Sequence, residues 1–92
     1  MQERDSVFVA DRVRHYLQGI HPGGATLEVL ENQIWRDEFA WNVPIQPDFQ
    51  PKRLFEYYES LADVMIELAD NENLNVYLVA SDSKADISDQ AA

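Results

Sequence analysis

Residues 52–72 repeat apolar side chains at the three- and four-residue spacing of an α-helix, and this segment constrains the fold more than any other. At about 100° per residue, the apolar positions cover an arc of about 200°, roughly twice the width that contact with one surface needs. We therefore expect a helix that is buried on two sides, with Leu61 and Met65 fully buried at its centre. The apolar positions are Leu54, Phe55, Tyr57, Tyr58, Leu61, Ala62, Val64, Met65, Ile66, Leu68 and Ala69.

The remaining face of this helix is acidic and carries no basic residue. Three functions fit such a face: a divalent-cation site, a docking face for a basic protein partner, or a mimic of nucleic-acid phosphates. A solvated face that only maintains solubility fits as well. Neither a calcium-binding loop nor a Glu-x-x-His motif is present to favour the cation site. The acidic positions are Glu56, Glu59, Asp63, Glu67 and Asp70.

The charges at the two ends of this helix oppose its macrodipole. Lys52 and Arg53 lie at its N-terminal end, whereas Asp70 and Glu72 lie at its C-terminal end. Each such charge costs about 0.3–1 kcal/mol at low salt. We expect either contacts elsewhere that compensate, a binding role for the acidic end, or packing that outweighs the cost.

The rest of the chain predicts one further helix and three strands. Apolar residues recur at helical spacing over residues 6–19, after Asp5 as a candidate N-cap. Apolar and polar residues alternate over residues 25–34 and 38–45, which predicts two strands joined by a turn. Residues 74–80 are short, apolar and rich in β-formers, which predicts the third strand.

The order αββαβ predicts an α+β domain with two layers, in which two helices cover one face of a three-stranded mixed sheet. A right-handed crossover through the second helix makes the third strand parallel to the second. The simplest sheet has the first strand in the middle, in the order 2-1-3. No Asn-Gly or Asp-Gly turn sets the register of the hairpin. Pro44 predicts that the second strand has a free edge at that point, or ends there.

This arrangement leaves apolar surface without a partner. The third strand is an edge strand and is apolar on both faces, a combination that proteins normally guard against. A homodimer would cover this edge together with the second apolar side of the long helix. The candidate dimer interface consists of Tyr57, Val64, Val76, Tyr77, Leu78 and Val79.

The two tryptophans lie on either side of the predicted hairpin turn. Trp41 shares the expected inward face with Phe39 and Val43, which predicts a core residue. Trp35 lies at the turn, where a large ring is harder to bury. It is either an anchor for a partner or a ring that folds back over the hairpin.

No motif predicts catalysis or a cofactor. His15 and His21 are six residues apart, and no HExxH or His-x-x-x-His pair exists, so solvated histidines are the favoured interpretation. The glycine-rich residues 22–24 follow a helix and lack the pattern of a phosphate-binding loop. We therefore expect no metal, no cofactor and no enzymatic activity.

Composition excludes several classes of function. Seventeen acidic residues against seven basic ones give a formal charge of −10, which repels nucleic acids and anionic membranes, so we expect neither as a direct partner. The chain has no cysteine, which excludes disulfides and thiolate chemistry. The first residues are charged and no apolar run approaches the ~20 residues of a membrane span, so we expect a cytoplasmic protein.

The sequence thus predicts one small domain at residues 1–82 and a disordered polar tail at residues 83–92. The favoured function is a homodimeric protein-interaction module, such as an adaptor, a small chaperone or a neutralising partner of a basic protein. The alternative is an accessory subunit of a hetero-complex. A small-ligand-binding protein or an enzyme is the least favoured class.

Overall fold

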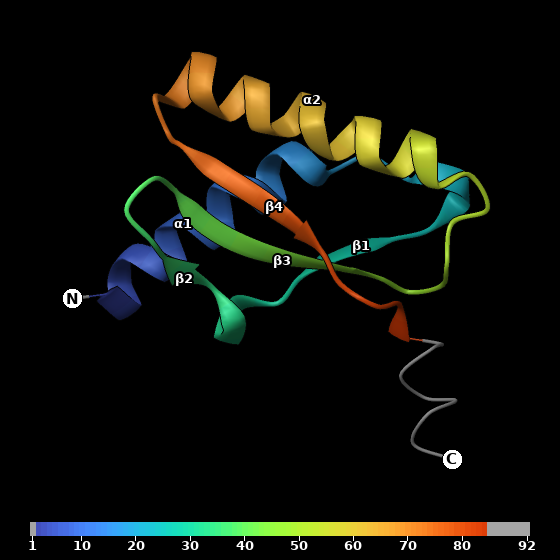
Figure 1. Ribbon diagram of the computed structural model, residues 1–92, viewed down its shortest axis with the longest axis horizontal. Helices are drawn as coiled ribbons and strands as arrows, with labels where there is room; N and C mark the ends of the chain where they lie inside the picture. The colour runs from blue at the N-terminus through green and yellow to red at the C-terminus, as the bar shows by residue number, and fades with distance from the viewer. Residues whose placement is uncertain (1, 85–92) are drawn as a thin grey trace.

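The computed structural model describes residues 2–84, with side chains from Asp5 onward. Two helices and four strands follow one another in the order α1, β1, β2, β3, α2, β4 (Figure 1). Their bounds are Gln2–Leu17 (α1), Leu27–Val29 (β1), Trp35–Arg36 (β2), Trp41–Pro47 (β3), Leu54–Glu72 (α2) and Val76–Ala80 (β4). Two short 3-10 helices, η1 and η2, span Pro22–Gly24 and Glu31–Gln33.

Helix α1 begins earlier than the sequence predicts. Asp5 lies inside the helix and is not its N-cap, so the predicted start at residue 6 is wrong. The helix ends just before Gly19, whose φ of 81° is a left-handed conformation that glycine adopts without steric cost.

Strand β3 is the centre of a mixed four-stranded sheet. Its Ile45 pairs with Val29 of β1 in antiparallel orientation and with Ala80 of β4 in parallel orientation, so β1 and β4 lie on opposite sides of β3. The parallel pair confirms that β4 runs in the same direction as β3, as expected for strands connected through α2. The predicted strand order is wrong, because the strand predicted at residues 38–45, and not the one at 25–34, lies in the middle. Burial is the physical reason: all seven residues of β3 are buried, whereas the earlier segment carries polar residues that suit an edge.

The strand predicted at residues 25–34 is interrupted by η2, which separates β1 from β2. Pro44 of β3 lies opposite this interruption, and its carbonyl oxygen accepts a hydrogen bond from the Leu30 N–H at 3.0 Å. Proline has no N–H to donate to a neighbouring strand. It is tolerated at this position because the strand opposite it is interrupted by η2. The free edge that Pro44 predicts is therefore local, and β3 continues beyond it.

An aspartate turn sets the register of the β2–β3 hairpin. The Asp37 N–H donates to the Ala40 carbonyl at 3.1 Å, and the Oδ1 of Asp37 accepts from the N–H groups of Phe39 and Ala40, both at 2.8 Å. The Asn42 Nδ2 donates to the other carboxylate oxygen at 3.0 Å. These hydrogen bonds, first that from Ala40 and then that from Phe39, lower the pKa of Asp37. The turn therefore pairs Trp35 with Asn42.

Both helices pack on one face of the sheet, which confirms a two-layer α+β architecture. Alternate residues of β3 point toward the helices, as the alternation predicts for Trp41, and join side chains of α1 and α2 in one cluster. Phe39, which was expected on this face, is 77% exposed because it lies in the turn and not in the strand. The core residues are Val9, Ala10, Val13 and Leu17 of α1, Tyr57, Leu61, Val64 and Leu68 of α2, and Val29, Trp41, Val43, Ile45, Val76 and Leu78 of the strands.

Helix α2 is rotated relative to the predicted orientation. Leu61 is buried as expected, but Met65 is only partly buried, and burial is centred on the side that carries Tyr57 and Val64. Because α1 packs beside α2, it covers that side together with the sheet. The other side of the apolar arc is left at the surface, where Ile66 is 58% exposed.

The chain stays packed beyond the end of β4. Asn73 ends α2 in the left-handed conformation, with a φ of 53°, which asparagine tolerates. The Gln46 Nε2 donates to the Asp82 carbonyl at 3.1 Å, and Ser83 is fully buried. Most of the predicted tail, residues 85–92, lies outside the described residues. Within the described part, no helix is both long and apolar enough to cross a bilayer.

Candidate interaction surface

The backbone of β4 has one paired side and one open side. Two hydrogen bonds flank its ladder with β3: the Trp41 N–H donates to the Asn75 carbonyl at 3.0 Å, and the Ser81 N–H donates to the Ile45 carbonyl at 2.9 Å. In a parallel ladder the backbone groups of successive residues turn alternately toward and away from the neighbouring strand. These two bonds show that the odd-numbered residues of β4 direct their backbone N–H and C=O groups toward β3.

The even-numbered residues of β4 turn their N–H and C=O groups to the open edge. Within residues 2–84, β4 pairs with β3 alone, so no described strand meets these groups. An edge of this kind is a template for pairing with another chain. The residues are Val76, Leu78 and Ala80.

A groove of about 450 Å³ runs between α2 and this edge. Helix α2 lies beside β4 (Figure 1). No charged side chain lines it, although the chain as a whole carries a formal charge of −10. The lining residues are Tyr58, Leu61 and Met65 of α2 and Tyr77, Leu78, Val79 and Ala80 of β4.

Exposed apolar residues of α2 continue this uncharged surface. Phe55 is 76% exposed and Tyr58 is 52% exposed, and Ala62 and Ile66 follow at helical spacing, so that all four lie on one side of the helix. We call the whole surface the neutral strip. It consists of Phe55, Tyr58, Ala62, Met65, Ile66 and Ala69 of α2 with Val76–Ala80 of β4.

The predicted acidic stripe lies on the far side of the neutral strip from β4. Glu59 is four residues from Phe55, and Asp63 is three residues from Ile66, so the acidic side chains border the apolar ones. Arg53 forms an ion pair with Glu56 at 3.2 Å. Among residues 5–84, whose side chains the structure describes, the exposed members of the stripe form no ion pair; they are Glu59, Asp63, Glu67 and Asp70.

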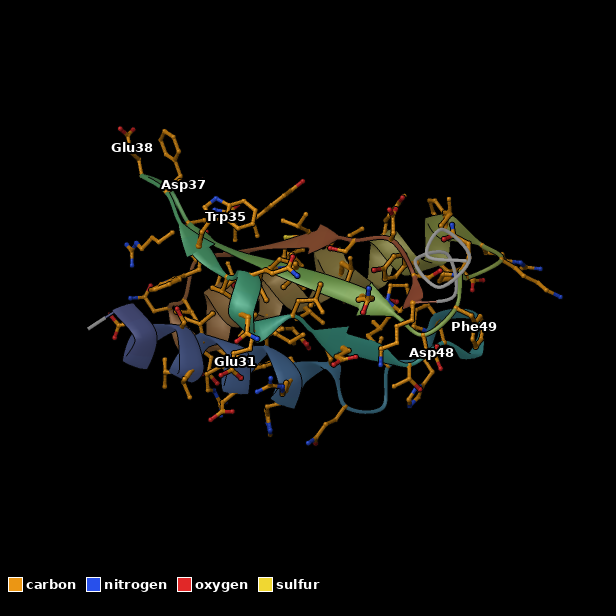
Figure 2. All side chains as sticks on the ribbon, turned by 90° about the horizontal axis from the view of Figure 1, so that it is seen from below. Glu31, Trp35, Asp37, Glu38, Asp48 and Phe49 are labelled. Carbon is orange, nitrogen blue, oxygen red and sulfur yellow. The ribbon has the colours of Figure 1, made fainter. Side chains whose placement is uncertain are left out.

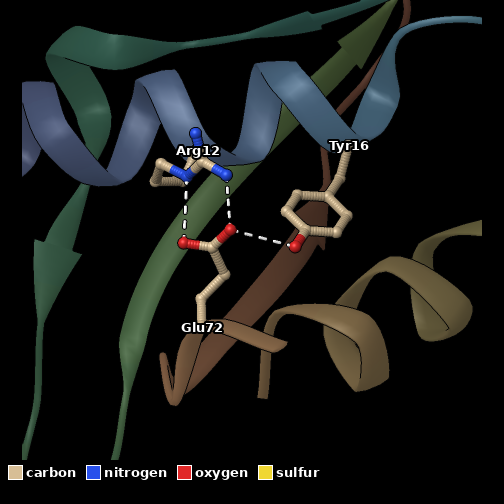
Figure 3. A network of polar contacts seen from close by, with 3 residues as sticks. All are labelled: Arg12, Tyr16 and Glu72. Atoms are coloured by element: carbon tan, nitrogen blue, oxygen red, sulfur yellow. Dashed lines mark hydrogen bonds and ion pairs between the residues drawn. The ribbon is translucent and has the colours of Figure 1, made fainter. Parts of the chain in front are cut away.

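A polar network ties the C-terminal end of α2 to α1 (Figure 3). The Arg12 guanidinium holds both carboxylate oxygens of Glu72, with Nε at 3.1 Å from Oε1, and the Tyr16 hydroxyl donates to Oε2 at 3.0 Å. The hydrogen bond from Arg12, and then that from Tyr16, lower the pKa of Glu72. This contact compensates a carboxylate that opposes the helix dipole, which makes the role of Glu72 structural.

The β2–β3 hairpin is a second exposed region. Trp35 is 49% exposed, and Figure 2 shows it with Asp37 and Glu38 on the hairpin that projects away from α1. Asn42 pairs with Trp35 on one side and with Tyr77 on the other, so the two aromatic residues flank it on the sheet face away from the helices. The ring of Trp35 therefore does not fold into the core.

The predicted dimer interface divides into buried and accessible residues. Tyr57, Val64, Val76 and Leu78 have side chains in the core and do not present them to a partner. The Tyr57 hydroxyl lies 3.4 Å from the Ile45 carbonyl, and burial raises the pKa of Tyr57 to about 12. Tyr77 is 56% exposed and Val79 is half-buried. Sequence reasoning missed Phe55, Tyr58 and Ile66 as surface residues, although their helical spacing was the available signal.

The described residues offer no metal-binding cluster, since no three or more His, Cys, Asp or Glu side chains are placed to hold an ion. His15 packs edge-on against Tyr16 with ring centroids 5.5 Å apart, and His21 is exposed. Comparison with known protein families, with curated proteins and with solved structures found no match to this chain.

Proposed function

We propose that the protein is a non-enzymatic protein-interaction module that adds a strand of another chain to the open edge of β4. The observation that supports this proposal is the coincidence of a regular edge strand with an uncharged groove beside it. In strand addition, backbone hydrogen bonds supply affinity, while pockets beside the edge supply specificity through alternate side chains.

The groove has the form that this mode of binding needs. Its volume of about 450 Å³ is enough for a few side chains of an added strand. Tyr58 and Met65 lie above the edge and would contact every second side chain of that strand. The cytoplasm is the proposed compartment, because a chain without cysteine suits a reducing environment.

The acidic stripe is a second candidate docking face, for a basic protein. Its four exposed carboxylates have no ion pair in the described part of the chain, so a cluster of lysines or arginines would find uncompensated charge there. Such a contact would be weakened strongly by salt, whereas strand addition at the neutral strip would not.

Peptides selected from a random displayed library test the proposal. The protein is immobilised at low density, so that copies cannot meet, and binding is compared for wild type, Ala80→Pro and Ala80→Ser. Proline removes an N–H that faces the open edge and serves no bond to β3, whereas serine keeps it. We expect selected peptides to lose at least about tenfold in affinity for Ala80→Pro only.

A second variant is used if Ala80→Pro has a lower melting temperature than wild type, so that a loss of binding could reflect a loss of folding. Tyr77→Lys places a charge on the exposed edge and leaves the backbone unchanged. Selected peptides that bind both Ala80→Pro and Tyr77→Lys as well as wild type would show that the edge of β4 is not the binding site.

A further inference from the structure

We propose that the chain added to β4 is β4 of a second copy, paired antiparallel about a two-fold axis at Leu78. This inference rests on the proposed function, since it names the occupant of the same edge. A symmetric contact of this kind uses one surface twice and closes on itself, which is the commonest arrangement of homo-oligomers.

The backbone of β4 fixes the register. Val76, Leu78 and Ala80 face outward, so an axis at Leu78 pairs Leu78 with itself and Val76 with Ala80 of the second copy. Each such pair exchanges two N–H···O bonds in an antiparallel ladder. No other centre uses all three outward residues of the strand, so this register satisfies the most backbone groups.

Side chains on the open face of the sheet complement one another in this register. Tyr77 then lies directly opposite Val79 of the second copy, at a non-hydrogen-bonded position where side chains are closest. An aromatic residue against a β-branched one is a favourable cross-strand pair. The exposed ring of Tyr77 would be covered by this contact.

In this arrangement the α2 helices of the two copies also contact each other through residues of suitable size. Because α2 lies beside β4, joining the two edges brings the neutral strips of the two α2 helices together. Ala62 and Ala69 lie seven residues apart on the strip and let two helices approach closely, while Tyr58 and Met65 fill the space beside them.

Charge favours a second copy over a basic segment as the occupant. The groove and the edge carry no charged residue, so a basic segment would find no opposite charge within them. A copy with a formal charge of −10 is normally repelled, but here the acidic stripe is displaced from the edge by the apolar side of α2. The neutral strip is thus the part of the α2–β4 surface where two such chains meet without repulsion.

Cysteine cross-linking tests the register directly, because the natural chain has no cysteine. Two full-length variants, Tyr77→Cys and Val79→Cys, are oxidised alone and after mixing. In the proposed register, residues 77 and 79 of opposite copies are about 4.5 Å apart at Cα, within reach of a disulfide. Identical positions lie on a diagonal at about 7–8 Å and cross-link poorly. We expect covalent dimer at least several times faster in the mixture than in either variant alone.

Sedimentation equilibrium of the cysteine-free chains completes the test. Wild type should reach twice the chain mass at micromolar concentration, and Ala80→Pro should raise the dissociation constant at least tenfold while Ala80→Ser does not. If the wild-type chain stays monomeric at 100-fold higher concentration, the proposal that a second copy binds the edge is wrong. Library peptides that still bind and still depend on Ala80 would then show that the edge binds a different chain. A dimer whose dissociation constant is unchanged by Ala80→Pro, and which forms no mixed disulfide, would show that self-association uses another surface and that the proposed register is wrong.

Discussion

The first edge of the sheet, formed by β1 and β2, differs from the second edge, formed by β4, in length, regularity and charge. The first edge is broken by η2 and carries ion pairs between Arg14 and Glu31 at 2.8 Å and between Lys84 and Glu28 at 3.0 Å. The second edge runs unbroken over Val76–Ala80 beside a groove without charged lining.

The first edge is protected against pairing with another chain, whereas the second edge is not. Short strands, interruptions and charged side chains are the usual means by which proteins prevent edge-to-edge association, and the first edge has all three. The second edge has none of them within the described residues. The regular, uncharged second edge is the observation on which the proposed pairing with another chain rests.

The largest expected effect concerns the support beneath the second edge. Leu61 is 2% exposed and packs between α2 and the sheet, so Leu61→Ala should reduce the free energy of unfolding by about 2–5 kcal/mol. Phe8→Ala on α1, where the side chain is 55% exposed, should change it by less than about 0.5 kcal/mol. Urea denaturation at one protein concentration measures both. Equal losses would show that the core does not lie under β4.

A charge on the second edge should weaken association. Tyr77→Glu places like charges near the proposed two-fold axis, and we expect the dissociation constant of the proposed dimer to rise at least tenfold, or about 1.4 kcal/mol. Trp35→Glu places the same charge on the same sheet face but on the first edge, and it should leave the constant within about twofold. Sedimentation equilibrium compares the two. A larger rise in the dissociation constant for Trp35→Glu than for Tyr77→Glu would show that the first edge, and not the second, carries the association.

Acid should act on the ion pair between Arg12 of α1 and Glu72 of α2. The pKa of Glu72 is lowered in the folded state, so its carboxylate adds stability above its unfolded pKa of about 4.5 and loses that contribution as pH falls through the folded value. Glu72→Gln should melt below wild type at pH 7, and the difference should shrink below about pH 4.5. Glu67→Gln, an exposed acid of the same helix, is the control for thermal melts over this range. A constant difference would mean that the Arg12 contact is not charge-dependent.

The smallest expected effect concerns the acidic stripe. Neutralising Glu59, Asp63 and Asp70 with glutamine or asparagine should change the dissociation constant of the proposed dimer by less than about threefold at 0.15 M salt, because these exposed charges lie across the neutral strip from the edge and are screened. The same measurement at low salt tests the reasoning. Dimerisation that strengthens more than tenfold would place the stripe inside the interface.

Much of the fold could be predicted from local pattern. The end of α2 at Glu72 and the parallel pairing of β3 with β4 follow from periodicity and chain handedness, although α2 begins at Leu54 and not at residue 52. The candidate site was only half predicted: Tyr77 and Val79 do reach the surface, whereas Tyr57 and Val64 do not. An apolar arc wider than one contact admits more than one orientation, and only packing against α1 selects one.

Local patterns in the sequence are enough to locate α1, α2, β3 and β4, because the spacing of apolar residues and the chemistry of Gly19 and Asn73 act over a few residues. Tertiary structure alone decided that β3 is central and that the Phe55 side of α2 faces solvent. These outcomes depend on which distant surfaces compete for the same apolar residues. Which apolar residues become buried therefore depends on contacts across the whole chain, and no short stretch of sequence is enough to predict it.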